Sequence, residues 1–159
     1  MALNVDLAGL APADALDLAV LIEEEGRQRY IELAELMDEV HGNREAAAFF
    51  AEMSTKEEAH GRELWSRREA SYPDAPHRID GSLLDEIHVP DSSGVHPDLS
   101  ARGCLEIALA AERAAEAFFR AALPRVMHPE VRALFTELAD EEVEHQALLA
   151  ARIPFSQRS

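Results

Sequence analysis

Two copies of the motif Glu-x-x-His are the residues of this chain best suited to metal chemistry. Glu57 and His60 form the first copy, and Glu142 and His145 form the second. Residues three apart lie on the same face of an α-helix, so each pair can reach one small volume. Carboxylate and imidazole ligands together suit iron or manganese. The spacing predicts a metal site if both pairs lie on helices that face each other.

The two motifs occupy equivalent positions in an internal repeat. Residues 49–64, FFAEMSTKEEAHGREL, align without a gap with residues 134–149, LFTELADEEVEHQALL. Two such motifs alone would mean little in a chain rich in glutamate. Equivalent positions in an ungapped repeat are much less expected by chance. We infer that the chain contains two copies of one helical hairpin.

The first helix of each copy contributes a further carboxylate. Residues 16–30 align with residues 105–119, and this alignment places Glu23 on Glu112. An aromatic residue follows each glutamate after seven positions, which is two helical turns along the same face. In the first copy this residue is Tyr30. We expect Tyr30 to pack in the core and to hydrogen-bond one of the metal ligands.

Six candidate ligands would share the interior of one bundle. They are Glu23, Glu57, His60, Glu112, Glu142 and His145. Four buried carboxylates would repel one another, and without metal we expect burial and repulsion to raise the pKa of each. Two divalent cations balance the four charges, and two neutral imidazoles complete the set. This is the ligand pattern of di-iron carboxylate bundles, so we predict two iron ions per chain, with manganese as the alternative metal.

Four helices must position these residues. Alanine, glutamate, leucine and arginine dominate the chain, and they favour helix. Gly42 is suited to end the first helix, and Asn43 and Ser100 are suited to cap the second and third. The predicted elements are a helical hairpin over 12–71, a connector over 72–99 with a short helical turn near 83–87, and a second hairpin over 100–153.

The connector decides the topology. It holds four of the eight prolines, and as an extended chain it can span a bundle helix of about 42 Å. Short loops within each hairpin make its two helices antiparallel neighbours. The sequence therefore predicts an all-α protein, a single domain over 1–159, in which a four-helix bundle has one long crossover between helices 2 and 3.

Composition excludes several classes of protein. The formal net charge of −16 disfavours nucleic acid and anionic membrane surfaces as partners. The only cysteine, Cys104, excludes an internal disulfide framework or a four-cysteine iron site, and we expect it to be a small core residue. No apolar stretch is long enough to span a membrane, and residues 1–10 lack the basic flank of a secretory signal. We predict a cytoplasmic protein.

The motifs resemble those of the rubrerythrin-like proteins of the ferritin-like superfamily. Residues 23–30, EEEGRQRY, are similar to the first-helix motif of that family. The sequence EEAH at residues 57–60 is similar to the second-helix motif, and EVEH at residues 142–145 to the fourth. The resemblance covers all four helices and fails in the connector. It implies a ferritin-like antiparallel bundle.

The resemblance also implies a role for each ligand. Glu57 and Glu142 would bridge the two metals, Glu23 and Glu112 would each bind one metal, and each histidine would supply one nitrogen. The family carries a second glutamate on the third helix, but Ala115 occupies that position here. The implied site has two histidines and four carboxylates. Other nearby glutamates are expected to lie at the surface; these are Glu58, Glu116, Glu141 and Glu144.

The function implied by the resemblance is that of a di-iron oxidoreductase reducing hydrogen peroxide or dioxygen. One cysteine cannot build a rubredoxin domain, so the electron donor would be external. We also expect a homodimer or a larger homo-oligomer.

Three alternatives remain open at this point. One is a ferroxidase or iron-storage protein. A ferritin cage normally uses a fifth helix, but few residues follow the fourth helix here. Storage would therefore favour enclosure by a separate shell protein. A second is a di-iron oxygenase, which needs a pocket for an organic substrate beside the metals. The third is a metal-free interaction protein, against which the complete ligand set argues.

Overall fold

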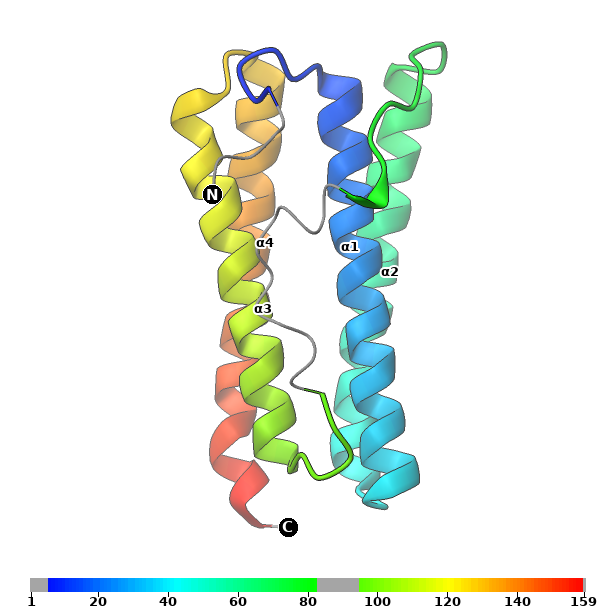
Figure 1. Cartoon of the computed structure of the whole chain (residues 1–159), viewed down its shortest axis with the longest axis vertical. Coiled ribbons are helices and arrows are strands. Elements are labelled where there is room, and N and C mark those ends of the chain that lie inside the picture. The colour runs from blue at the N-terminus through cyan, green and yellow to red at the C-terminus, as the bar shows by residue number, and fades with distance from the viewer. Residues whose placement is uncertain (1–5, 83–94, 159) are drawn as a thin grey trace.

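Four long helices lie side by side and are joined by short turns and one long connector (Figure 1). The structure is a computed structural model that describes residues 6–82 and 95–158. The long helices are α1 (Pro12–Glu35), α2 (Arg44–Ser71), α3 (Ala101–Ala122) and α4 (Pro129–Arg152). Three short segments extend them: a π-helix, η1 (Leu36–Val40), and two 3-10 helices, η4 (Leu123–Arg125) and η5 (Ile153–Arg158).

The helix ends follow the local chemistry of the sequence. Gly42 lies in the turn between α1 and α2 with φ of 60°, a left-handed conformation that favours glycine. The Asn43 side chain accepts a hydrogen bond of 3.1 Å from the Ala46 amide at the start of α2. Ser100 accepts one of 3.0 Å from the Gly103 amide at the start of α3. Both predicted caps are confirmed.

The chain direction matches the predicted crossover. The close contacts between helices lie mainly within each hairpin, between α1 and α2 and between α3 and α4. In Figure 1, α2 ends at the top of the bundle and α3 begins at the bottom, so these two helices run parallel. Residues 72–82 therefore start at the top of the bundle, whereas residues 95–100 lead into α3 at the bottom. The all-α bundle with one long crossover is confirmed, whereas the predicted turn at 83–87 lies outside the described residues.

Apolar side chains fill the bundle interior as two separate clusters. One contains Leu18, Phe119 and Phe135 among others, and lies toward the top of Figure 1. The other contains Tyr30 and Phe50 and lies toward the bottom. The predicted core position of Cys104 is confirmed, because it is fully buried in this second cluster. On each helix the candidate ligands fall between the residues of the two clusters.

A buried ion pair fixes the start of the connector. Arg68 on α2 has no exposed surface, and its Nε donates a 3.0 Å hydrogen bond to Asp17 Oδ1 on α1. Its guanidinium also donates to the carbonyl oxygens of Tyr72, Ala75 and Pro76. Arg68 thereby joins α1, α2 and the first residues after α2.

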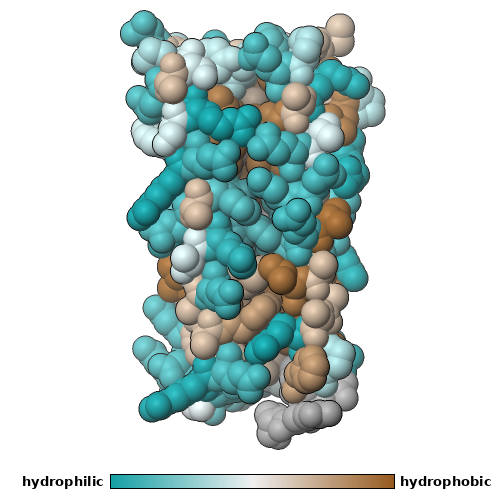
Figure 2. Space-filling view, turned by 180° about the vertical axis from the view of Figure 1, so that it is seen from behind, coloured by the Kyte–Doolittle hydropathy of each residue, from teal (hydrophilic) through white to brown (hydrophobic). Residues whose placement is uncertain are grey.

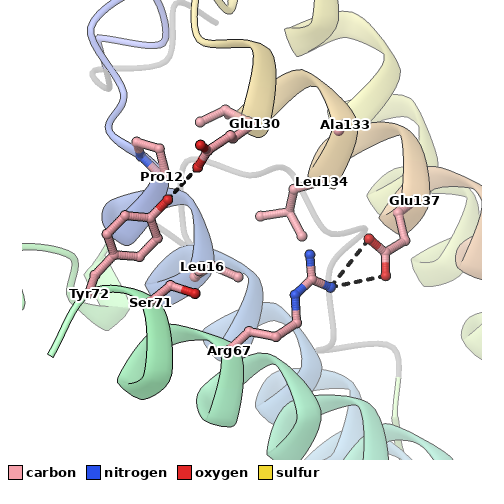
Figure 3. Close-up of a pocket in the computed structure, with 10 residues that line it drawn as sticks. Pro12, Leu16, Arg67, Ser71, Tyr72, Glu130, Ala133, Leu134 and Glu137 are labelled. Carbon is pink, nitrogen blue, oxygen red and sulfur yellow. Dashed lines mark hydrogen bonds and ion pairs between the residues drawn. The ribbon is translucent and has the colours of Figure 1, made fainter.

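Surface contacts join the two hairpins near the top of the bundle. Arg67 on α2 donates a 3.0 Å hydrogen bond to Glu137 on α4, and Tyr72 hydrogen-bonds Glu130 (Figure 3). These residues border a hollow of about 250 Å³ between the hairpins. Polar side chains cover most of the face shown in Figure 2, with apolar ones interspersed. Within the described residues, no helix has the length and apolar character required to cross a membrane.

Candidate metal centre

Carboxylates from all four helices meet between the two apolar clusters. Glu23 on α1, Glu57 on α2, Glu112 on α3 and Glu142 on α4 are each at most 7% exposed. An isolated buried carboxylate is costly, so such a group requires protons, hydrogen bonds or cations. All four predicted carboxylates therefore lie where a shared cation could neutralise them.

His145 lies at the centre of this group. Its Nδ1 atom is 3.2 Å from Glu57 Oε1 on the opposite hairpin, 3.5 Å from Glu112 Oε1 and 3.9 Å from Glu142 Oε2. The ring is buried. One nitrogen thus faces three carboxylates that come from α2, α3 and α4.

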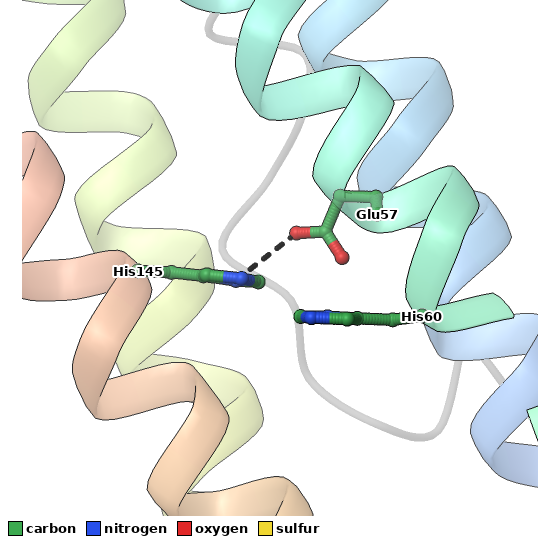
Figure 4. A group of neighbouring side chains, drawn as sticks. All are labelled: Glu57, His60 and His145. Carbon is green, nitrogen blue, oxygen red and sulfur yellow. Dashed lines mark ion pairs between the residues drawn. The ribbon is translucent and has the colours of Figure 1, made fainter. Parts of the chain in front are cut away.

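His60 takes the corresponding place in the other half, but with more access to solvent. Its Nδ1 atom lies 3.7 Å from Glu23 Oε2, and 28% of its side chain is exposed. The rings of His60 and His145 stack with centroids 5.4 Å apart and an interplanar angle of 7°. Figure 4 shows both histidines approaching from opposite hairpins, with Glu57 beside them. The structure therefore brings all six predicted ligands together.

Unpartnered polar atoms mark this region. Among the described residues, four buried side-chain nitrogen or oxygen atoms have no hydrogen bond, and all four belong to this centre. They are Glu23 Oε2, His60 Nδ1, Glu141 Oε2 and His145 Nδ1. A buried polar group without a partner costs about 1–3 kcal/mol. Carboxylate oxygens and imidazole nitrogens that converge without hydrogen bonds are suitable ligands for divalent cations. The residues present therefore fit two metal ions.

Tyr30 orients one of the carboxylates. Its hydroxyl donates a 2.5 Å hydrogen bond to Glu112 Oε1, and its ring stacks on Phe50 at 6.3 Å between centroids. Burial, followed by the charge of Glu112, raises the pKa of Tyr30 well above its usual value. The phenol therefore keeps its proton and remains a hydrogen-bond donor to Glu112.

In the absence of metal, two of the carboxylates bind protons more readily than usual. Burial and the neighbouring carboxylates of Glu23 and Glu112 raise the pKa of Glu57 well above its usual value. Burial and Glu112 do the same for the pKa of Glu142. The expected rise in pKa is confirmed for these two residues.

The expected rise is wrong for Glu112. Burial alone would raise its pKa, but interactions with Glu142 and His145 outweigh burial and lower the pKa to about 2. Two buried carboxyl groups that share a proton do not titrate alike, because the group that keeps the proton donates it to its neighbour. The interaction between the two residues accordingly lowers the pKa of Glu112 and raises the pKa of Glu142.

Both histidines gain protons more readily than usual. The adjacent carboxylate of Glu23 raises the pKa of His60. Burial lowers the pKa of His145, but interactions with Glu112 more than offset burial and the net pKa is raised. The metal-free centre thus favours protonation of Glu57, Glu142 and both histidines.

One of the glutamates predicted at the surface belongs to the centre. The carboxylate Oε2 atom of Glu141 is buried and lies 3.8 Å from His60 Nδ1. The prediction that Glu141 is a surface residue is therefore wrong for its functional group. Glu58 pairs with Arg62 at the surface, Glu116 with Arg120, and Glu144 is exposed.

A glycine on α1 makes room for Glu57. A Cβ atom at Gly26 would lie 3.2 Å from the Glu57 carboxyl carbon and 3.3 Å from its Oε1. A Cβ at Gly61 on α2 would meet only Glu23 Cβ, at an ordinary 3.7 Å. Glycine is unfavourable in a helix interior, so Gly26 in the sequence signals a close approach that was not recognised there.

We expect replacement of these two glycines by alanine to have different effects on metal binding and on stability. We expect Gly26→Ala to displace the Glu57 carboxylate and to weaken metal binding about tenfold or more. Gly61→Ala should leave metal binding unchanged and stabilise the metal-free protein by up to about 1 kcal/mol, because alanine favours helix. Metal titration and urea unfolding of both variants test this. Equal metal affinity in the two variants would contradict the assigned role of Gly26.

A surface hollow of about 490 Å³ lies between α1 and α2 and borders one of the candidate ligands. Glu57 lies in its wall together with Val20, Gly61 and Trp65. Charged and polar side chains make up most of the remaining wall; these are Glu24, Arg27, Glu58, Arg62 and Ser66. A small polar molecule in this hollow could therefore contact a candidate metal ligand.

The fold and the site together define a four-helix carboxylate–histidine protein with a candidate di-metal centre. The sequence profile of the Rubrerythrin family matches residues 14–153, and the chain belongs to this family. A solved structure of an uncharacterised conserved protein from Magnetospirillum magnetotacticum MS-1 is similar. Its sequence is 27% identical, and the match covers 91% of this chain and 95% of that one with a TM-score of 0.75. The comparison with curated proteins gave no match.

Proposed function

We propose that this protein is a di-iron oxidoreductase that reduces hydrogen peroxide, with dioxygen as a slower oxidant. The observation that carries the proposal is a group of four buried donor atoms that lie between the two hairpins and make no hydrogen bonds. Membership of the rubrerythrin family favours iron as the metal. A pair of ferrous ions, when bound, supplies the two electrons that, with two protons, convert hydrogen peroxide into two molecules of water.

Each half of the centre would hold one metal. Glu23 and His60 are the donors on one side, and Glu112 and His145 are the donors on the other. Glu57 belongs to the first hairpin but lies 3.2 Å from His145 of the second, which supports a bridging role for it. By the internal repeat, Glu142 would be the matching bridge. Manganese remains the alternative metal for the same donor set.

Tyr30 acts as a positioning residue in this proposal. Its hydrogen bond to Glu112 Oε1 restrains one carboxylate oxygen and leaves the other free to bind metal. Such contacts to metal ligands typically change metal affinity or activity by about 10–100-fold when they are removed.

The hollow beside Glu57 supports a small oxidant. Most pockets for organic ligands are lined by apolar and aromatic side chains. Five of the nine residues that line this one carry charged side chains, and Arg27 and Arg62 are held there by Glu24 and Glu58. Charged side chains at the wall can accommodate a small polar oxidant such as peroxide. We further propose an external electron donor, a cytoplasmic location and a homo-oligomer.

Anaerobic titration with Fe(II) tests the metal content. We expect saturation at about two ions per chain. Glu57→Ala should weaken both sites together, because the residue is assigned as a bridge. Glu58→Ala removes the same charge from the neighbouring surface position and should leave both sites intact. Full occupancy in Glu57→Ala would contradict the assignment.

Stopped-flow oxidation of the Fe(II)-loaded protein tests the oxidant. We expect peroxide to oxidise the centre faster than dioxygen by about tenfold or more, which corresponds to about 1.4 kcal/mol in the barrier. A clear preference for dioxygen would instead indicate a ferroxidase or an oxygenase.

A further inference from the structure

Glu141 brings a fifth carboxylate to the centre from an unexpected direction. It precedes Glu142 on α4, and successive helical residues point about 100° apart, so both would not be expected to reach one site. Nevertheless, Glu141 Oε2 lies 3.8 Å from His60 Nδ1 on α2. Glu23 Oε2 on α1 lies 3.7 Å from the same nitrogen. Three helices therefore place one donor atom each around a common point.

These three donor atoms lack hydrogen bonds. Glu23 Oε2, His60 Nδ1 and Glu141 Oε2 are all buried and unpartnered, and Glu23 as a residue is only 2% exposed. Donor atoms bound to one metal at about 2.0–2.2 Å lie about 3–4 Å from one another. The measured separations agree with this geometry. The three residues form one of the carboxylate–histidine groups able to hold an ion.

The internal repeat has no counterpart of this carboxylate. The alignment that places Glu57 on Glu142 places Lys56 on Glu141. Lys56 is exposed, so the group of Glu112, Glu142 and His145 receives no matching residue from α2. The two halves of the centre therefore differ in charge by one carboxylate, although their other ligands are related by the repeat.

We propose that Glu141 is a ligand of the metal held by Glu23 and His60, and that this metal position fills first. The proposal rests on the proposed di-metal function. An additional anionic donor strengthens the attraction for a cation, so the two positions are unequal in affinity. Glu141 would thus give this metal position a second ligand from α4, in addition to the bridging Glu142.

Titration with Co(II) alone, followed by its visible absorption and by calorimetry, tests the proposal. We expect the wild-type protein to bind two ions in two steps of different affinity. Glu141→Gln should weaken the tighter step about tenfold or more and change its Co(II) spectrum, with the weaker step unaltered. Glu144→Gln removes the same charge from an exposed position one turn away on α4 and should behave as wild type.

Each outcome has a distinct meaning. The Glu141 side chain makes no hydrogen bond at its buried oxygen, and glutamine is of equal size, so Glu141→Gln should retain the fold. Thermal unfolding of the metal-free variant checks this. Two wild-type-like steps in Glu141→Gln would overturn the assignment of Glu141 and leave the di-metal function standing. Absence of Co(II) binding by the wild-type protein would overturn both.

Discussion

Metal loading is expected to stabilise the protein most strongly at neutral pH. The pKa of Glu57 and of Glu142 is raised in the folded state, so the metal-free native protein holds protons that the unfolded chain has released. Their contribution to the free energy of unfolding is fully present below the unfolded pKa of about 4.5 and is lost as the pH rises through the folded values. The metal-free protein should therefore lose stability between about pH 5 and 8.

The other titrating ligands agree with this direction. His60 and His145 also have raised pKa values, so their contribution is lost as the pH rises above about 6.5. The lowered pKa of Glu112 affects stability only as the pH falls from about 4.5 toward about 2, outside this window. Bound cations replace the protons, and each site should add about 4 kcal/mol when free metal exceeds the dissociation constant a thousandfold.

Anaerobic thermal unfolding with and without Fe(II), between about pH 5 and 8, measures the effect. The matched control is the double variant Glu57→Gln/Glu142→Gln, in which the amides imitate the protonated carboxyl groups but cannot ionise. Metal-free, it should lose less stability than wild type as the pH rises, although the net charge of −16 acts on both proteins. The same pH slope in both would show that these carboxylates do not share a buried centre.

Replacing Arg68 should be the most destabilising substitution outside the metal centre. Arg68→Met leaves Asp17 buried without its bidentate partner and frees the carbonyl groups of Tyr72, Ala75 and Pro76. Removing one member of a buried ion pair costs about 3–5 kcal/mol. We expect a loss of that size in the free energy of unfolding in urea.

The neighbouring residue provides the control. Arg67 pairs with Glu137 at the surface, and exposed ion pairs contribute about 0–1 kcal/mol. Arg67→Met should therefore be nearly neutral. Adding Asp17→Asn to Arg68→Met should recover part of the lost stability, because the uncompensated charge is removed. If Arg68→Met proved as mild as Arg67→Met, the buried ion pair would not anchor the connector.

Local chemistry explains why so much of the bundle could be predicted. Asn43, Gly42 and Ser100 act within a few residues of themselves, so the sequence contains the information that ends and starts the helices. Helical spacing likewise put Tyr30 on the face of Glu23, and the repeat identified the equivalent positions in the second hairpin. The sequence alone was therefore enough to predict that these six residues would lie together, without knowledge of how the helices pack.

Features that depend on packing between helices were missed. Glu141 could not be recognised because its reach to His60 depends on the spacing and rotation of α4 against α2. Arg68 resembles any solvated arginine until the loop after α2 folds over it. The direction of the pKa shift of Glu112 depends on which neighbour keeps a shared proton. Each of these requires coordinates of residues distant in sequence.

The division of the ligands between two hairpins has a consequence for the order of folding. Most close helix contacts are local to a hairpin, and local contacts form quickly because little loop entropy is lost. Glu23, Glu57 and His60 belong to one hairpin, whereas Glu141 and His145 belong to the other. A complete coordination sphere therefore exists only after the hairpins dock. Colour developed by a bound transition metal during refolding would report that docking step, separately from the earlier growth of helix.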